Sequence, residues 1–117
     1  MVRLAMRPTK EEILELIEKK KNMLTLCEGK RDVIALRKLG FMHVRELDGP
    51  IYKIVESIEK GTCIQLLVDF DEHGRGLYSR LNHEFRQRGV HIDNELREAL
   101  FTTGVQHVEG LDTYLRD

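Results

Sequence analysis

Three acidic residues, Glu28, Asp69 and Asp71, are the side chains in this sequence best suited to chemistry. Alternate side chains of an extended segment point the same way, so Asp69 and Asp71 should project together while Phe70 turns back toward the core. Two carboxylates a few ångströms apart repel by on the order of a few kcal/mol, a cost that a shared cation removes. Oxygen ligands favour a hard ion, so the sequence predicts that Asp69, Asp71 and Glu28 bind Mg²⁺, with Mn²⁺ as the alternative.

Glycines and basic residues accompany these acids. Gly29 directly follows Glu28, and Gly74 lies three residues after Asp71, each near the predicted start of a helix. Glycine at such a place lets a backbone or a phosphate come close, and helix amino termini attract anions. Basic side chains next to both turns are candidates for binding phosphate or nucleic acid: Lys30, Arg31 and Arg75. A cation, helix dipoles and basic side chains around one point suit phosphoryl chemistry.

Each of these acids on its own is a weak signal. Acids are common in solvated turns at helix starts, where they cap the helix and interact well with its dipole. Their combination is a stronger signal, because all three acids follow the two most apolar predicted strands and each is followed by a glycine and a helix.

The elements that must position these residues alternate between strand and helix. Short apolar runs predict strands at 23–27, 43–47, 63–68 and 90–92. Helical spacing, caps and terminal glycines predict helices over about 9–21, 30–39 and 51–58, a helix through 77–85, and a last helix over about 94–101. This alternation predicts a three-layer α/β/α, Rossmann-like fold with a mainly parallel four-stranded sheet.

The acids also predict how the strands are ordered. Glu28 can meet Asp69 and Asp71 only if the strands at 23–27 and 63–68 are neighbours, which gives the order 2-1-3-4. Sheets of this class bind ligands beyond the strand carboxyl ends, where the strand order reverses. We therefore expect one domain over 1–117, with a core at about 23–101, an N-terminal helix at about 9–21 and a short tail. The spacing of Leu111, Tyr114 and Leu115 in that tail indicates either a packed helix or a partner surface.

Composition narrows the class of protein. Hydrophobic residues make up 41% and charged residues 33%, which is typical of a soluble globular domain. The apolar stretches are too short to cross a bilayer and the segment 1–21 lacks the apolar core of a secretory signal, so we expect a cytoplasmic protein with no membrane contact. Cys27 and Cys63 are expected to be buried free thiols.

The runs 24–32 and 66–75 resemble the two motifs of the TOPRIM domain, which primases, topoisomerases and the nucleases that mature ribosomal RNA share. The resemblance extends over about 23–92. It implies that Glu28 is a general acid/base or a metal ligand and that Asp69 and Asp71 coordinate Mg²⁺. Gly29 and Gly74 match the family's glycines. Lys30 and Asp32 match the Glu-Gly-Lys-x-Asp form of its small stand-alone and nuclease-like members.

Other polar residues near the motifs have weaker claims. His73 is either a supporting group or a solvated loop residue, and Arg80 is the best placed of the arginines on its helix to help. The remaining histidines share no ligand spacing and are interpreted as ordinary surface or half-buried residues: His43, His83, His91 and His107.

Three functions follow as hypotheses. The first is Mg²⁺-dependent phosphodiester chemistry on RNA or DNA by a nuclease-like TOPRIM protein. The second is a non-catalytic, metal-dependent module that binds nucleic acid or nucleotide and works with a protein partner; a homodimer also remains open. The third and weakest is a phosphate-accepting receiver domain. The net charge of −1 means that nucleic-acid contact must come from a local basic patch or from bound cations.

Overall fold

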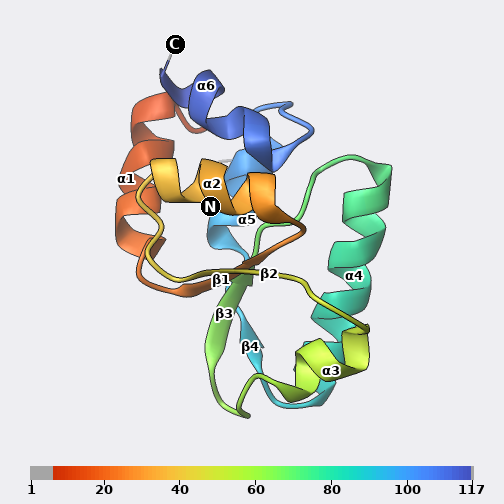
Figure 1. The fold of residues 1–117 in the computed structure, drawn as a ribbon. Coiled ribbons are helices and arrows are strands. Elements are labelled where there is room, and N and C mark those ends of the chain that lie inside the picture. Colours follow the sequence, from red (N-terminus) through yellow and green to blue (C-terminus); the bar gives the residue numbers. More distant parts are fainter. Residues whose placement is uncertain (1–6, 117) are drawn as a thin grey trace.

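A computed structural model describes residues 7–116 of the chain (Figure 1). Its sheet has four parallel strands in the order β2-β1-β3-β4. The strands are β1 (Leu24–Cys27), β2 (Val44–Glu46), β3 (Cys63–Leu66) and β4 (His91–Ile92). Because Leu26 lies opposite Leu66, the chain leaves β1 and β3 at the same edge of the sheet. The predicted strand order is thus confirmed.

Helices follow the strands as the sequence predicts. They are α1 (Lys10–Lys20), α2 (Lys30–Lys38), α3 (Ile51–Glu56), α4 (Glu72–Gln87), α5 (Glu95–Phe101) and α6 (Leu111–Arg116), with a 3₁₀ turn η1 (Val108–Gly110) before α6. The capping box predicted for α1 is present: the Glu12 N–H donates to Thr9 Oγ1 at 3.0 Å and the Thr9 N–H donates to Glu12 Oε1 at 2.8 Å.

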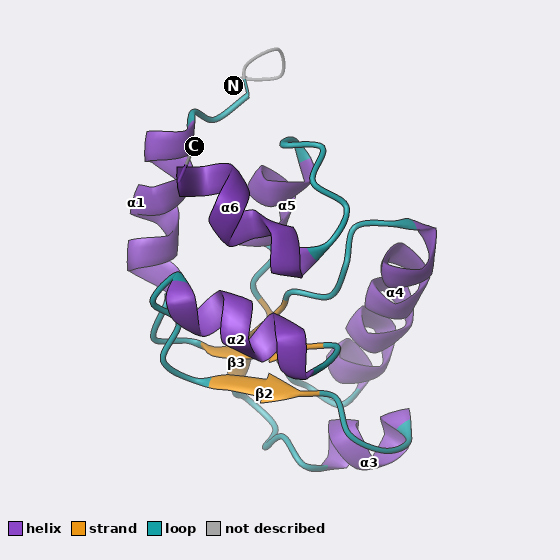
Figure 2. Cartoon of the chain, turned by 45° about the horizontal axis from the view of Figure 1, so that its top comes forward, coloured by secondary structure: helices purple, strands orange, loops and turns teal. Residues whose placement is uncertain are grey.

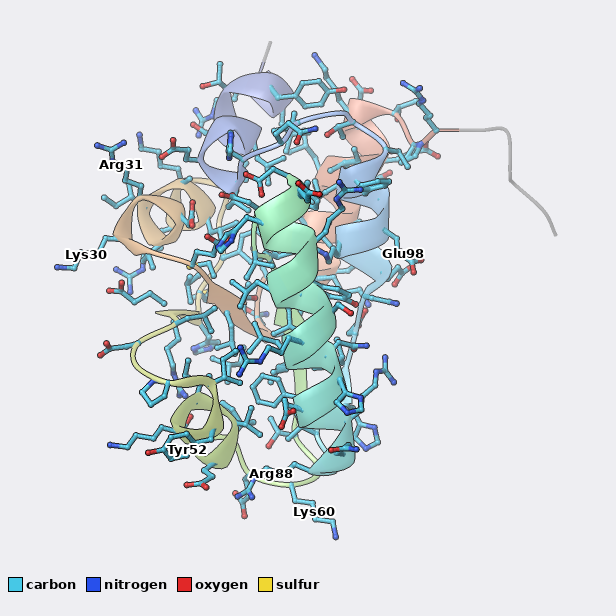
Figure 3. The ribbon with its side chains drawn as sticks, turned by 90° about the vertical axis from the view of Figure 1, so that its right-hand side faces the viewer. Lys30, Arg31, Tyr52, Lys60, Arg88 and Glu98 are labelled. Atoms are coloured by element: carbon cyan, nitrogen blue, oxygen red, sulfur yellow. The ribbon has the colours of Figure 1, made fainter. Side chains whose placement is uncertain are left out.

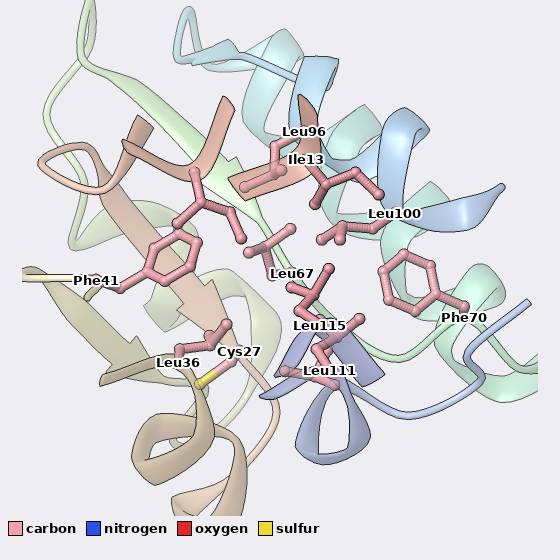
Figure 4. Close-up of a cluster of buried hydrophobic side chains, with 12 residues drawn as sticks. Ile13, Cys27, Leu36, Phe41, Leu67, Phe70, Leu96, Leu100, Leu111 and Leu115 are labelled. Carbon is pink, nitrogen blue, oxygen red and sulfur yellow. The ribbon is translucent and has the colours of Figure 1, made fainter. Parts of the chain in front are cut away.

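Alternation along the strands divides the core between the two faces of the sheet. Cys27 and Leu67 pack with side chains of α1, α2, α5 and α6, the cluster drawn in Figure 4. Leu26 and Leu66 face the other way and pack with side chains of α3 and α4. Figure 2 shows the sheet between these two groups of helices, so the three-layer α/β/α fold is confirmed.

The C-terminal tail completes the first of these clusters. Leu111 and Leu115 of α6 are buried, and Tyr114 packs against the same cluster. The packed-helix alternative for this tail is therefore the correct one. Among the helices of residues 7–116, none combines the length and the apolar character that a bilayer span requires.

Both cysteines are free thiols, as predicted, but the predicted burial of Cys63 is wrong. Cys27 is buried at the end of β1, and burial raises the pKa of its thiol to about 12. Cys63 is exposed, because it is the first residue of β3 and only the following three positions of that strand are covered. An apolar run alone does not show which of its ends emerges from the core.

A candidate metal site at the carboxyl edge of the sheet

Two segments carry the predicted acids: residues 28–32 after β1, and residues 69–71 after β3, which we call the acidic segment. A contact between Glu28 and Asp69 brings the two together. Glu28 lies one residue beyond β1, and its Oε1 accepts a hydrogen bond of 3.3 Å from the backbone N–H of Asp69. This contact crosses between neighbouring strands at their carboxyl ends, where the sequence predicts that the acids meet.

Backbone N–H groups anchor one oxygen of each aspartate. Asp69 Oδ1 accepts from the Val108 N–H at 2.8 Å, and Asp71 Oδ1 accepts from the Gly74 N–H at 2.8 Å. Asp71 thereby caps the amino terminus of α4. Phe70 between them is buried, as predicted. Both aspartate side chains are consequently held in defined orientations.

The second oxygens of these aspartates lie close to His107. His107 Nδ1 is 3.3 Å from Asp69 Oδ2 and 3.8 Å from Asp71 Oδ2. Each of Asp69, Asp71 and His107 offers one ligand atom such that all of these atoms lie within 4.8 Å of one another. The hydrogen bond with Asp69, together with the charges of both aspartates, raises the pKa of His107.

His107 is exposed at the surface, as expected, but its contact with the two aspartates was not foreseen from the sequence. The loop before η1 runs beside the acidic segment, because the Phe70 N–H donates to the Gln106 carbonyl oxygen at 2.7 Å. Nothing in the spacing of His107 along the chain marks this pairing, which arises only when the tail folds back over the sheet edge.

Glu28 contacts Asp69 but lies outside the cluster of Asp69, Asp71 and His107.

A cleft of about 380 Å³ opens beside the acids. Its lining comes from the turn after β1, the start of α2, Asp69, and the loop before η1 together with η1 itself: Glu28, Gly29, Lys30, Arg31, Asp32, Asp69, His107 and Glu109. Lys30 and Arg31 are exposed at the start of α2, and Figure 3 shows both side chains reaching outward from it. A Cβ atom at Gly29 would meet nothing within 4 Å, so the cleft is open beside Glu28.

Asp32 lines this cleft next to the turn after Glu28. It is buried, and its Oδ2 accepts from the Gly29 N–H at 3.2 Å, which holds the turn after Glu28. Burial raises its pKa from the ordinary 3.8 to about 6, and the charge of Asp69 adds to this shift.

Asp32→Asn should therefore stabilise the protein at neutral pH. The folded protein binds the Asp32 proton more tightly than the unfolded chain does. The contribution of Asp32 to the free energy of unfolding therefore falls as pH rises from 3.8 to about 6. Asparagine keeps an acceptor for Gly29 and carries no charge. We expect the variant to be more stable than the wild type by about 1–3 kcal/mol at pH 7.5, and by much less at pH 4. Urea unfolding at both pH values measures this, and a difference that does not change with pH contradicts the assignment.

Arg97 is a second residue that the sequence did not single out. It is buried, and its guanidinium lies over the rings of Phe70 and Tyr78, at 4.6 Å and 4.4 Å from their centroids. Its Nη1 donates to the Val68 carbonyl oxygen at 2.6 Å and its Nη2 to that of Asp69 at 3.0 Å. Arg97 thus fixes the backbone that leads into the acidic segment, a role that no local pattern reveals.

The other predicted residues lie on α4 or at its start. His73, Arg75 and Arg80 are exposed and are not among the residues that line the cleft. Gly74 is buried against the acidic segment, where an added Cβ would overlap the carbonyl oxygen of Asp69. The predicted close approach at Gly74 is therefore made by the protein's own backbone.

The donor set suits a divalent cation. The Oδ2 atoms of Asp69 and Asp71 both lie near His107 Nδ1, and their Oδ1 atoms accept hydrogen bonds from backbone N–H groups. The two aspartate side chains are 19% and 35% exposed. Hydrogen-bonded carboxylates that remain partly open to water are typical of sites where an ion also contacts a substrate.

Individual relatives, and not a family model, show which family the chain belongs to. No model of a known protein family matches the chain. The UPF0292 protein of Methanocaldococcus jannaschii is 34% identical over 118 residues, covering 90% of this chain and 91% of that protein. A UPF0292 protein of Methanosarcina acetivorans is 31% identical, covering 90% of this chain and 78% of that protein. The solved structure of a putative protein from Aquifex aeolicus has a TM-score of 0.75 and 26% identity, covering 85% of this chain and 94% of that one. The fold is thus shared with a solved structure, and the chain belongs to the UPF0292 protein family.

Proposed function

We propose that this protein carries out Mg²⁺- or Mn²⁺-dependent phosphodiester chemistry on nucleic acid, as a nuclease-like enzyme. The observation that carries the proposal is the convergence of Glu28, Asp69 and Asp71 at the carboxyl ends of neighbouring parallel strands. The resemblance of both segments to TOPRIM motifs supports it.

The proposed roles follow from the contacts. Asp69 and Asp71 would hold the cation through their Oδ2 atoms. A bound divalent ion stabilises the negative charge that develops on phosphate oxygens during the reaction. Glu28 is partly exposed in the cleft beside Asp69. There it would act as a general base toward the attacking group or as a general acid toward the leaving group. Arg97 would keep the backbone of Asp69 in place through its hydrogen bond to the Asp69 carbonyl oxygen.

The charges of the cleft imply that substrate binding depends on the cation. Lys30 and Arg31 attract phosphate at the rim, but Glu28, Asp69 and Glu109 repel it from the same cleft. The whole chain has a net charge of −1 and offers no general attraction to a polyanion. A divalent ion would neutralise the charge of Asp69 and Asp71 and so reduce the repulsion of phosphate in the cleft. Nucleic-acid binding is therefore expected to require metal.

Glu28→Gln provides the functional test. We expect wild-type protein to shorten labelled RNA or DNA oligonucleotides with Mg²⁺ or Mn²⁺ and not with EDTA. Glu28→Gln should lose this turnover by at least about 100-fold, as expected when a general acid or base is removed, and should still bind metal and oligonucleotide. Glu109→Gln is the matched control, because it removes the same charge from the same cleft. Within residues 7–116 it is Glu28, and not Glu109, whose side chain accepts a hydrogen bond from Asp69.

The outcomes separate the competing functions. Metal-dependent cleavage that Glu28→Gln abolishes and Glu109→Gln leaves intact supports the enzyme. Metal-dependent oligonucleotide binding without product, over long incubation, supports the non-catalytic binding module instead. Neither binding nor cleavage in the presence of metal contradicts both functions.

A further inference from the structure

We infer, on the basis of the proposed metal-dependent function, that His107 is a third protein ligand of the cation and gives the site a preference for Mn²⁺ over Mg²⁺. Neither of the two segments that carry the predicted acids contains this residue, and the roles proposed above for the acids do not require it. It would change the site from an all-oxygen set to two carboxylates and one imidazole.

The positions of the donor atoms support this assignment. Two ligands about 2.1 Å from one ion and at right angles to each other lie about 3 Å apart. His107 Nδ1 is 3.3 Å from Asp69 Oδ2 and 3.8 Å from Asp71 Oδ2. Changes of under about 1 Å would bring His107 Nδ1 to ligand spacing from both carboxylate oxygens.

The backbone on both sides of His107 is tied to the acidic segment. Gln106 accepts from the Phe70 N–H through its carbonyl oxygen, and Val108 donates its N–H to Asp69 Oδ1. Val108 is also fully buried. The position of His107 is therefore built into the fold, although its side chain is 57% exposed. That exposure leaves room around an ion for water and a phosphate oxygen.

The choice of ion follows from the nitrogen donor. Mg²⁺ prefers oxygen ligands and binds few protein groups besides carboxylates. Imidazole suits transition metals, and Mn²⁺ accepts both carboxylate and imidazole ligands. A site that contains Asp69, Asp71 and His107 should therefore retain Mn²⁺ more strongly than a site made of the carboxylates alone.

The competing role for His107 is that of a simple counter-ion. An imidazolium that pairs with Asp69 and Asp71 would occupy the position of the metal and compete with it. Removing His107 would then tighten the binding of both ions. Removing a ligand would instead weaken the binding of Mn²⁺ selectively, so the two roles predict opposite changes.

Metal titrations of the full chain test the inference. Mn²⁺ binding is followed by the electron paramagnetic resonance signal of free Mn²⁺, and Mg²⁺ binding is followed by calorimetry. His107→Ala should lower Mn²⁺ affinity by about tenfold or more and Mg²⁺ affinity by less than about threefold. His83→Ala is the matched control and should change neither, because His83 is exposed further along α4 and lies outside the cluster. Pulsed electron paramagnetic resonance of Mn²⁺-loaded wild type should show modulation from a nitrogen ligand, which His107→Ala should remove.

Two results overturn the inference and leave the proposed function standing. These are Mn²⁺ binding with no nitrogen modulation in the wild type, and tighter binding of both ions by His107→Ala. The nitrogen signal of the wild type decides the question even if a variant fails to fold. Failure of the wild type to bind either ion contradicts the proposed function itself.

Discussion

Asp69→Asn should lower the affinity for Mg²⁺ and Mn²⁺ by more than about 100-fold and leave the protein folded. Asparagine has nearly the same shape as aspartate and keeps an oxygen that can accept from the Val108 N–H, the contact that Asp69 Oδ1 makes. The variant loses only the charge and one anionic ligand atom. Asp71→Asn should behave alike, because an asparagine can also cap α4 through the Gly74 N–H.

Calorimetric titration and thermal unfolding together measure this effect. In the wild type, saturating metal should raise the melting temperature, because an ion that binds only the folded state stabilises it. In Asp69→Asn the melting temperature should not respond to metal. Asp48→Asn is the matched control, since Asp48 is exposed in the turn before α3 and lies outside the cluster. Metal binding by Asp69→Asn at wild-type affinity would remove the basis of the proposed site.

Gly74→Ala should destabilise the protein by about 1–3 kcal/mol or more and should also weaken metal binding. An added Cβ would overlap the carbonyl oxygen of Asp69 and lie 2.9 Å from its Cα. These are backbone atoms that Arg97 also holds, so they cannot move aside without displacing the acidic segment. The start of α4 or Asp69 itself must therefore shift.

Gly76→Ala is a close control for this effect. Gly76 lies two residues further along the same helix, and a Cβ there would meet nothing within 4 Å. Alanine at that position should leave metal affinity unchanged and raise the free energy of unfolding by up to about 1 kcal/mol, because alanine favours helix over glycine. Urea unfolding of both variants measures the contrast. Equal stability of the two variants would show that the close approach to Asp69 does not constrain the site.

The strand order could be predicted because it followed from chemistry as well as pattern. Alternating strands and helices indicate a parallel sheet, but several orders satisfy that pattern. Requiring Glu28 to meet Asp69 selected one order, and the structure has it. The metal and the function that this meeting implies stay predictions.

The glycines show how far a local signal reaches. Both Gly29 and Gly74 were expected to permit a close approach by a backbone or a phosphate. At Gly74 the approaching group is the Asp69 carbonyl, whereas the space beside Gly29 is open cleft. The same residue type thus serves two purposes, and only the packing of α4 against the acidic segment separates them.

His107 and Arg97 could not be found from the sequence for a common reason. Each reaches the site from an element packed against the sheet edge, at no fixed spacing from the acids. Arginines and histidines on helices and loops are usually solvated, so their residue types gave no signal. Their contacts depend on how α5 and the loop before η1 dock, which only the folded structure shows.

A crystal structure of the protein grown with Mn²⁺, with the ion located by its anomalous scattering, tests the central claim most directly. A peak should lie between the Oδ2 atoms of Asp69 and Asp71, at about 2.1–2.3 Å from each. Glu28 should lie beside it in the cleft. Contradiction would come from a peak elsewhere on the molecule, or from no peak at this edge of the sheet at saturating Mn²⁺.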